Sequence, residues 1–163
     1  MIQRRLKIIA ALLIIAIAVV AVGHWVVHTA EVQRSGSLRL KNLQHEVQVY
    51  FDAWGVPHID ARTDLDAYRA LGYLHAQDRL FQMDLLRRVG GGRLSELFGQ
   101  ESYATDKFFR TLGISRHARQ YAQYLRENAD KPHVQPIPAY QDGINQYIAQ
   151  GPIPVPSRLL LPR

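Results

Sequence analysis

The chain has 163 residues, a length typical of one ordinary domain. Its 20 Lys and Arg residues outnumber its 14 Asp and Glu residues and give a formal charge of +6. Three of the cations lie in the first seven residues, and from residue 31 onward the excess is +3. That remaining excess is spread along the sequence and forms no basic stripe, which argues against nucleic-acid binding. Because the sequence has no cysteine, a disulfide framework and a thiol nucleophile are both excluded.

Residues 1–30 have the pattern of a targeting segment. Arg4, Arg5 and Lys7 precede an apolar run that covers residues 8–27. A run of this length nearly crosses a hydrocarbon layer of about 30 Å, and basic residues at its first edge favour a cytoplasmic amino terminus. We therefore predict an N-terminal signal anchor that contacts the lipid bilayer. The rest of the chain would then face the periplasm or exterior of a bacterial inner membrane.

A cleaved signal peptide is the alternative interpretation of residues 1–30. Small residues at the end of the apolar run, around Gly23, are typical of a processing site. In that case the remaining chain would be exported without an anchor.

The next segment predicts a tether followed by a hairpin. Residues 31–46 are polar, with a short strand expected at Leu38–Leu40. Apolar and polar residues then alternate over 47–51, the period of a half-buried strand. The sequence DAWG at 52–55 predicts a turn, and Pro57 favours an extended backbone before it. Together these signals predict a β-hairpin.

About four helices are expected after the hairpin. Thr63 and Asp66 form a typical helix start, and the long helix that follows should run from about 64 to 89, before three glycines. Apolar periodicity predicts three further helices, at 93–99, 114–128 and 139–150. The proline-rich residues 151–163 predict a connector. The expected fold class is α+β and mainly helical.

The stretch HAQDRLFQMDLLRR at 75–88 combines an apolar helical pattern with charge. Asp78 falls within the apolar stripe of a helical wheel, where an acid usually pairs with Arg or with backbone donors. A metal site built on His58, His75 and Asp78 is the alternative, although one helical pair is a weak signal for a metal. The helix is apolar around much of its circumference and should be covered by a larger body.

Three segments in this order carry a resemblance. They read VQVYFDAWGVPHIDA, DAYRALGYLHAQDRLFQMDLLRRVGGGRLSELFG and AYQDGIN. Together they resemble the amino-terminal part of the penicillin acylase family, over residues 36–150. The signature positions are Asp52, Gly55, Pro57, His58, Gly72, His75, Gln77, Asp78, Arg79, Gln82, Asp84, Arg87, Arg88, Gly92, Glu96 and Gly99.

The resemblance implies that these positions are structural. Residues 47–150 would form the first region of the α chain of a larger αββα N-terminal-nucleophile hydrolase. The Asp78/Arg79 pair and the Arg87/Arg88 pair would hold this chain against a second chain. No residue here matches a catalytic, substrate-binding or metal position of the family.

The resemblance also implies a reaction. Family members are exported amidases, made as zymogens, that hydrolyse linear amides such as penicillins, other β-lactam side chains or N-acyl-homoserine lactones. A Ser that begins the second (β) chain attacks the amide carbonyl, and its own α-amino group accepts the proton. Complete family enzymes also hold calcium, whose ligands are not in this chain.

Residues 151–163 depart from the family pattern, so we expect the chain to be inactive alone. It would then be a fragment, a frameshifted reading, or a subunit with a separately encoded partner. The alternative function is that of a non-catalytic, membrane-anchored remnant or binding subunit.

Overall fold

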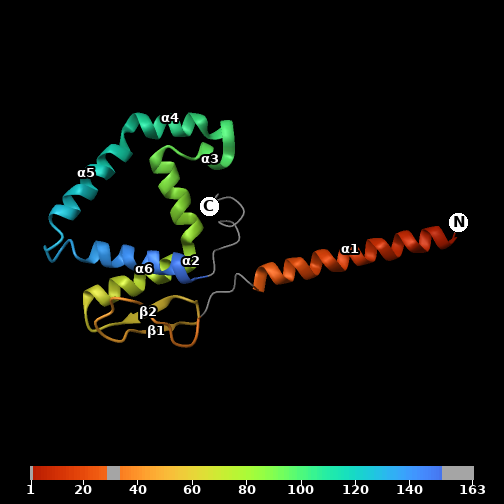
Figure 1. Cartoon of the computed structure of the whole chain (residues 1–163), viewed down its shortest axis with the longest axis horizontal. Helices are drawn as coiled ribbons and strands as arrows, with labels where there is room; N and C mark the ends of the chain where they lie inside the picture. The colour runs from red at the N-terminus through yellow and green to blue at the C-terminus, as the bar shows by residue number, and fades with distance from the viewer. Residues whose placement is uncertain (1, 29–33, 152–163) are drawn as a thin grey trace. The chain divides into compact units, whose positions relative to one another are not determined.

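The computed structural model describes residues 2–28 and 34–151. The connector predicted at 151–163 lies outside this range except for its first residue. The chain divides into two compact units, residues 1–31 and residues 32–163. The first unit contains helix α1 (Ile2–His28), and the second contains two strands and the remaining helices (Figure 1).

The predicted membrane helix is wrong. A helix that spans a bilayer needs about 20 consecutive, predominantly apolar residues. Within residues 2–28 and 34–151, no helix combines enough length with enough apolar character to cross a membrane. The lipid bilayer is therefore not supported as a partner of residues 8–27. The fold class is corrected to a mainly helical one with a single antiparallel hairpin.

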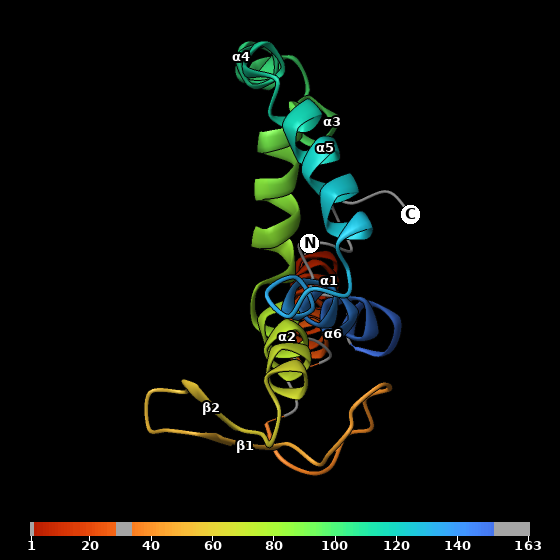
Figure 2. The same ribbon diagram turned by 90° about the vertical axis from the view of Figure 1, so that its left-hand side faces the viewer.

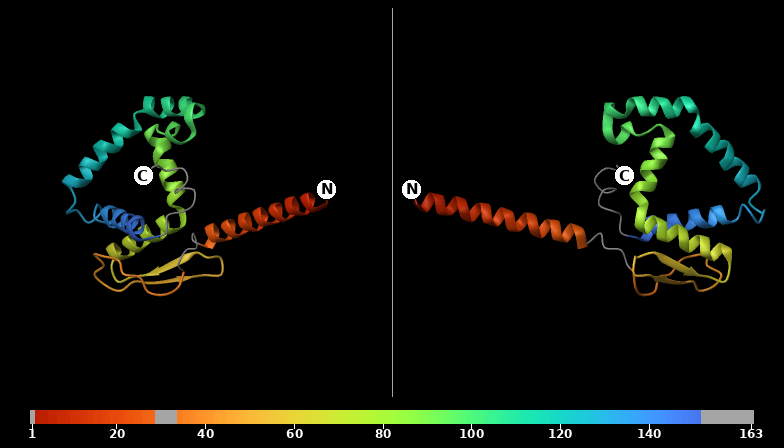
Figure 3. Two further views of the ribbon diagram at one scale, coloured as in Figure 1. Left: turned by 45° about the vertical axis from the view of Figure 1, so that its right-hand side comes forward. Right: turned by 180° about the vertical axis from the view of Figure 1, so that it is seen from behind.

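The predicted hairpin is present. Strand β1 (Gln48–Phe51) pairs antiparallel with β2 (Pro57–Asp60), and Tyr50 lies opposite His58. The hairpin lies beside the first half of the long helix, on the side away from α4 and α5 (Figure 3).

The short strand predicted at Leu38–Leu40 is not present among the described residues. The backbone of this region bonds to side chains instead of to a neighbouring strand. Lys41 donates its N–H to Gln146 at 2.7 Å and accepts from the same amide at 3.1 Å. Leu40 packs against the core. Long-range side-chain contacts thus replace the expected ladder.

The long helix α2 (Asp64–Gly91) begins where its local signals predict and ends two residues beyond the predicted end at 89, within the run of three glycines. The Thr63 side chain accepts a hydrogen bond from the Asp66 N–H at 3.2 Å, and Gly92 ends the helix with φ 62°. Arg79 has non-helical angles (φ −134°, ψ 23°) and kinks the helix. No proline lies in α2, so the sequence carries no signal for this kink.

Helix α6 (Pro136–Gln150) crosses the first half of α2 at very short range (Figure 2). A Cβ atom on Gly72 would lie 2.0 Å from the Tyr140 carbonyl oxygen, and one on Gly143 would lie 2.0 Å from that of Arg69. Only glycine allows the two backbones to approach this closely. The rings of Tyr73 and Tyr147 pack edge to face beside the crossing and form the core with Ala76.

Four shorter elements connect the far end of α2 to α6. They are α3 (Ser95–Phe98), the 3₁₀ turn η1 (Gly99–Ser102), α4 (Tyr103–Leu112) and α5 (Ile114–Glu127). Helix α4 was not predicted. It is short, it follows α3 and η1 without a polar loop, and it ends at Gly113 with φ 72°, directly before α5.

Replacing Gly72 by Ala should destabilise the chain by about 1–3 kcal/mol, because the added methyl group overpacks the crossing. Thermal circular dichroism of the full chain should show a lower Tm. Gly90→Ala in the same helix is the matched control, since its Cβ would lie 3.9 Å from the Ile114 side chain. Alanine favours a helix over glycine by about 0.5–1 kcal/mol, so this variant should keep or raise Tm. Equal Tm values for the two variants would contradict the crossing.

Candidate functional site

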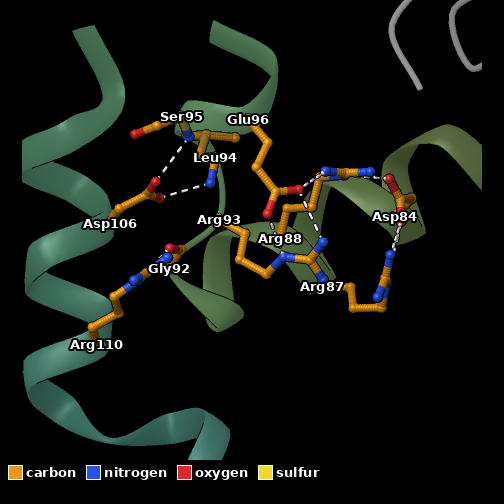
Figure 4. A network of polar contacts seen from close by, with 10 residues as sticks. All are labelled: Asp84, Arg87, Arg88, Gly92, Arg93, Leu94, Ser95, Glu96, Asp106 and Arg110. Carbon is orange, nitrogen blue, oxygen red and sulfur yellow. Dashed lines mark hydrogen bonds and ion pairs between the residues drawn. The ribbon is translucent and has the colours of Figure 1, made fainter. Parts of the chain in front are cut away.

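A polar network joins the end of α2 to α3 and contains most of the charged signature positions (Figure 4). Asp84 accepts from Arg87 at 2.5 Å and from Arg88 at 2.7 Å. The Asp84 side chain is 14% exposed and that of Arg88 is 8% exposed, so this pair is largely withdrawn from water. Burial acts to raise the pKa of the Asp84 carboxyl, but hydrogen bonds from Arg88 and Arg87 outweigh it and lower that pKa.

Glu96 extends the network from α3. It accepts from Arg88 at 2.5 Å and from Arg93 at 2.7 Å and 2.9 Å. The hydrogen bond from Arg93 lowers the pKa of Glu96, and the same contact raises the pKa of Arg93. Arg88 therefore bridges two carboxylates on successive elements and fixes the turn after α2.

Asp106 of α4 closes the network from the other side. Its two carboxylate oxygens accept from the backbone N–H groups of Leu94 at 2.7 Å and Ser95 at 2.8 Å. Arg110, one turn later on α4, donates to the Gly92 carbonyl oxygen at 2.7 Å. Burial acts to raise the pKa of Asp106, but hydrogen bonds from Ser95 and Leu94 outweigh it and lower that pKa. A side chain of α4 thus caps the start of α3, the helix that precedes it.

A second cluster lies at the opposite end of α2. Asp66 is fully buried, and its carboxylate accepts from the backbone N–H groups of Gln44 at 2.9 Å and His45 at 3.1 Å. Arg69 donates to Asp142 of α6 at 2.8 Å. Burial acts to raise the pKa of both acids, but their hydrogen bonds outweigh it and lower both values. These contacts tie the segment before the hairpin to both crossing helices.

Asp78 and Arg79 are more exposed than the helical wheel predicted. Arg79 donates to Asp78 at 3.0 Å and to Gln82 at 3.1 Å. The Asp78 side chain is 66% exposed, and the helix kinks at the next residue. The pair forms, but it lies at the surface and not within an apolar stripe.

The histidines of the metal hypothesis lie apart. His58 contacts Asp52 at 3.2 Å in the hairpin, and His75 contacts the Tyr140 hydroxyl at 2.9 Å on α6. Among residues with a described placement, no group of three or more His, Asp or Glu could hold a metal ion. Calcium, which the resemblance implies for complete enzymes, stays a prediction, because backbone and amide carbonyl oxygens also bind this ion.

A cavity of about 890 Å³ lies between the segment before the hairpin and the first half of α2. Its apolar walls include Leu38, Leu40, Val47 and Tyr73. Burial raises the pKa of the Tyr73 hydroxyl. Polar residues also line it, among them Gln44 and His45, whose backbone N–H groups bind Asp66.

The geometry defines a chain whose charged residues tie its helices and connecting segments together. Residues 46–162 match the model of the penicillin amidase family. The chain therefore belongs to the penicillin amidase family.

Two relatives illustrate the match. The chain is 43% identical to penicillin acylase 2 proenzyme of Pseudomonas sp. (strain SE83) over 127 residues, which cover 77% of this chain and 16% of that protein. It is 38% identical to acyl-homoserine lactone acylase QuiP of Pseudomonas aeruginosa over 114 residues, which cover 70% of this chain and 13% of that protein. The chain thus spans a small part of the length of these relatives.

A solved structure is also similar to the chain. It is the thermostable penicillin G acylase from Alcaligenes faecalis, with 33% sequence identity and a TM-score of 0.49. The match covers 72% of this chain and 59% of that chain.

Several residues of the two clusters escaped sequence reasoning. Arg69, Asp142 and Gln146 carried no local signal, because each has a partner far away in sequence. Asp66 was recognised only as part of a helix start. Its spacing to Thr63 was the one signal available, and it says nothing about the segment that Asp66 binds.

Asp84→Asn should destabilise the chain by about 2–4 kcal/mol, because it leaves the buried Arg88 guanidinium without a full counter-charge. The free energy of unfolding from urea denaturation is the measurement. Asp78→Asn is the matched control, and we expect a change of about 0.5 kcal/mol or less at this exposed position. A larger loss for Asp78→Asn than for Asp84→Asn would show that the exposed pair is the structural one.

The stability of the chain should fall in acid. Asp66, Asp84, Asp106 and Asp142 all have a folded-state pKa below the ordinary value of 3.8. A carboxyl with a lowered pKa stabilises the fold fully above its unfolded value and loses that effect as pH falls through the folded value. Tm should therefore change little at moderately acidic pH and drop below pH 3.8, less so in Asp84→Asn. A Tm that rises in this range would contradict the assignment.

Proposed function

We propose that this chain is the structural leading segment of an acylase that hydrolyses linear amide bonds in penicillin-type compounds or N-acyl-homoserine lactones. The observation that carries the proposal is the match to penicillin acylase 2 proenzyme and to the QuiP acylase over at least 70% of this chain. Because the chain spans 16% and 13% of these relatives, activity of a whole enzyme depends on further polypeptide.

In the proposed reaction, a Ser at the start of a second polypeptide attacks the amide carbonyl. The α-amino group of that Ser accepts the hydroxyl proton, and its ordinary pKa near 8 suits this role at neutral pH. The amine product leaves, and water hydrolyses the acyl-enzyme. The word proenzyme in the name of one relative supports processing of a precursor into two chains.

The role proposed for this chain is to present a rigid surface to the second polypeptide. The Asp84, Arg88 and Glu96 network and the Gly72 crossing hold the elements of residues 34–151 in place without using a group that could react with an amide. Large apolar side chains remain exposed on α4 and α5, among them Phe108, Leu112 and Tyr121. Apolar side chains clustered on a surface are typical of protein interfaces.

We also propose that the complete enzyme is exported from the cytoplasm. The basic residues Arg4, Arg5 and Lys7 before the apolar run support this location. Fractionation of cells that produce the tagged chain checks it, and recovery in the cytoplasm alone would contradict it.

Complementation tests the proposal. The full chain should show no hydrolysis of penicillin G or of an N-acyl-homoserine lactone, as measured by release of the free amine. Co-expression with the part of penicillin acylase 2 proenzyme that follows the matching segment should restore hydrolysis. Replacing by Ala the Ser that processing exposes at the start of the second polypeptide is the control and should abolish hydrolysis.

Two outcomes would contradict the proposal. Hydrolysis by this chain alone would place the reactive groups within it. A stable complex with no hydrolysis of either substrate would instead support a non-catalytic binding subunit.

A further inference from the structure

The tip of the hairpin exposes a large apolar side chain. Trp54 is 91% exposed, and its neighbours Tyr50 and Val56 are 61% and 51% exposed. Tryptophan is highly buried on average, so such exposure in a folded segment is unusual. Tryptophan and tyrosine are also the residues that most often contribute the binding energy of protein interfaces, where they fill pockets of the partner.

The backbone that carries Trp54 is held in place in this chain. One carboxylate oxygen of Asp52 accepts from the N–H groups of Trp54 and Val56, each at 2.9 Å. The Asp52 carbonyl oxygen also accepts from the Gly55 N–H at 3.0 Å, and Gly55 has φ 77°. A turn that is ordered before association loses little conformational entropy when it binds, which favours affinity.

The base of the tip is reinforced in the same way. The second oxygen of Asp52 contacts His58 at 3.2 Å, and the His58 ring stacks on Tyr50 with the ring centroids 5.0 Å apart. The hydrogen bond from Val56 lowers the pKa of Asp52, so the carboxylate remains charged and able to accept these bonds at neutral pH. The turn that carries the exposed indole is therefore ordered by these contacts.

The size of the relatives indicates what covers this tip. Most of the length of penicillin acylase 2 proenzyme has no counterpart in this chain. A hairpin of two strands is only marginally stable without further cover, and the sheet within residues 34–151 has two strands. We propose that Trp54 is the anchor residue by which the hairpin tip binds the second polypeptide of the acylase, with its indole inserted into an apolar pocket there. This inference rests on the proposed function, which supplies that polypeptide.

Fluorine NMR tests the insertion directly. The sequence has two tryptophans, Trp25 and Trp54, so a chain made with 5-fluorotryptophan gives two resonances, assigned with Trp25→Phe. The probe is the unlabelled second polypeptide of penicillin acylase 2 proenzyme. When it is added, the fluorine chemical shift of Trp54 should change. That chemical shift should also stop differing between H2O and D2O, because the buried indole no longer contacts solvent. The Trp25 resonance is the internal control and should keep this difference.

Affinity gives the second readout. Trp54→Ala should weaken binding of the second polypeptide at least about 30-fold, the effect expected of an interface hot spot. Trp25→Ala should change binding by less than about 2-fold, as expected outside an interface. Trp54 is exposed in the free chain, so its replacement should leave the circular dichroism spectrum unchanged.

The outcomes separate this inference from the proposed function. If the wild-type complex forms and hydrolyses amides while Trp54→Ala binds equally well, the anchor role is wrong and the function stands. If the wild-type chain neither binds nor restores hydrolysis, the proposed function fails and the anchor role fails with it.

Discussion

The contact on which the second unit depends is the crossing of α2 and α6 at Gly72 and Gly143. Carbonyl oxygens of each helix occupy the space that a side chain of the other would need. This close approach places Tyr73 against Tyr147 and brings Asp142 within reach of Arg69. The small core and the Arg69–Asp142 contact therefore both depend on glycine at these two positions.

Charged residues then extend this order along α2 in two directions. At its start, Asp66 binds backbone groups of the preceding segment, and at its end Asp84, Arg88 and Glu96 fix the turn into α3. In each place a carboxylate satisfies donors that burial would otherwise leave without partners. These carboxylates are therefore occupied by hydrogen bonds within the fold. This agrees with the proposal that the chain provides structure and that another polypeptide carries out the chemistry.

Local signals predicted the local features. Thr63 marked the start of α2, the run of three glycines marked its end to within two residues, and the DAWG turn marked the hairpin. Features that depend on distant partners were missed or wrong. The strand expected at Leu38–Leu40 is displaced by contacts 105 residues away along the chain, and the role of Asp106 depends on backbone groups 11 and 12 residues earlier. The apolar run near the amino terminus predicted a membrane helix that the structure does not support.

Contacts on both sides of the kink at Arg79 fix the number of residues between Gly72 and Arg88. The Gly72 contact holds one half of the helix, and the Arg88 contacts hold the other. Adding or removing one residue between them would turn one half relative to the other by about 100°, one step of an α-helix. Either the glycine or the arginine would then face the wrong way. Substitutions at the exposed surface between them should thus be tolerated by this family far more readily than any insertion or deletion.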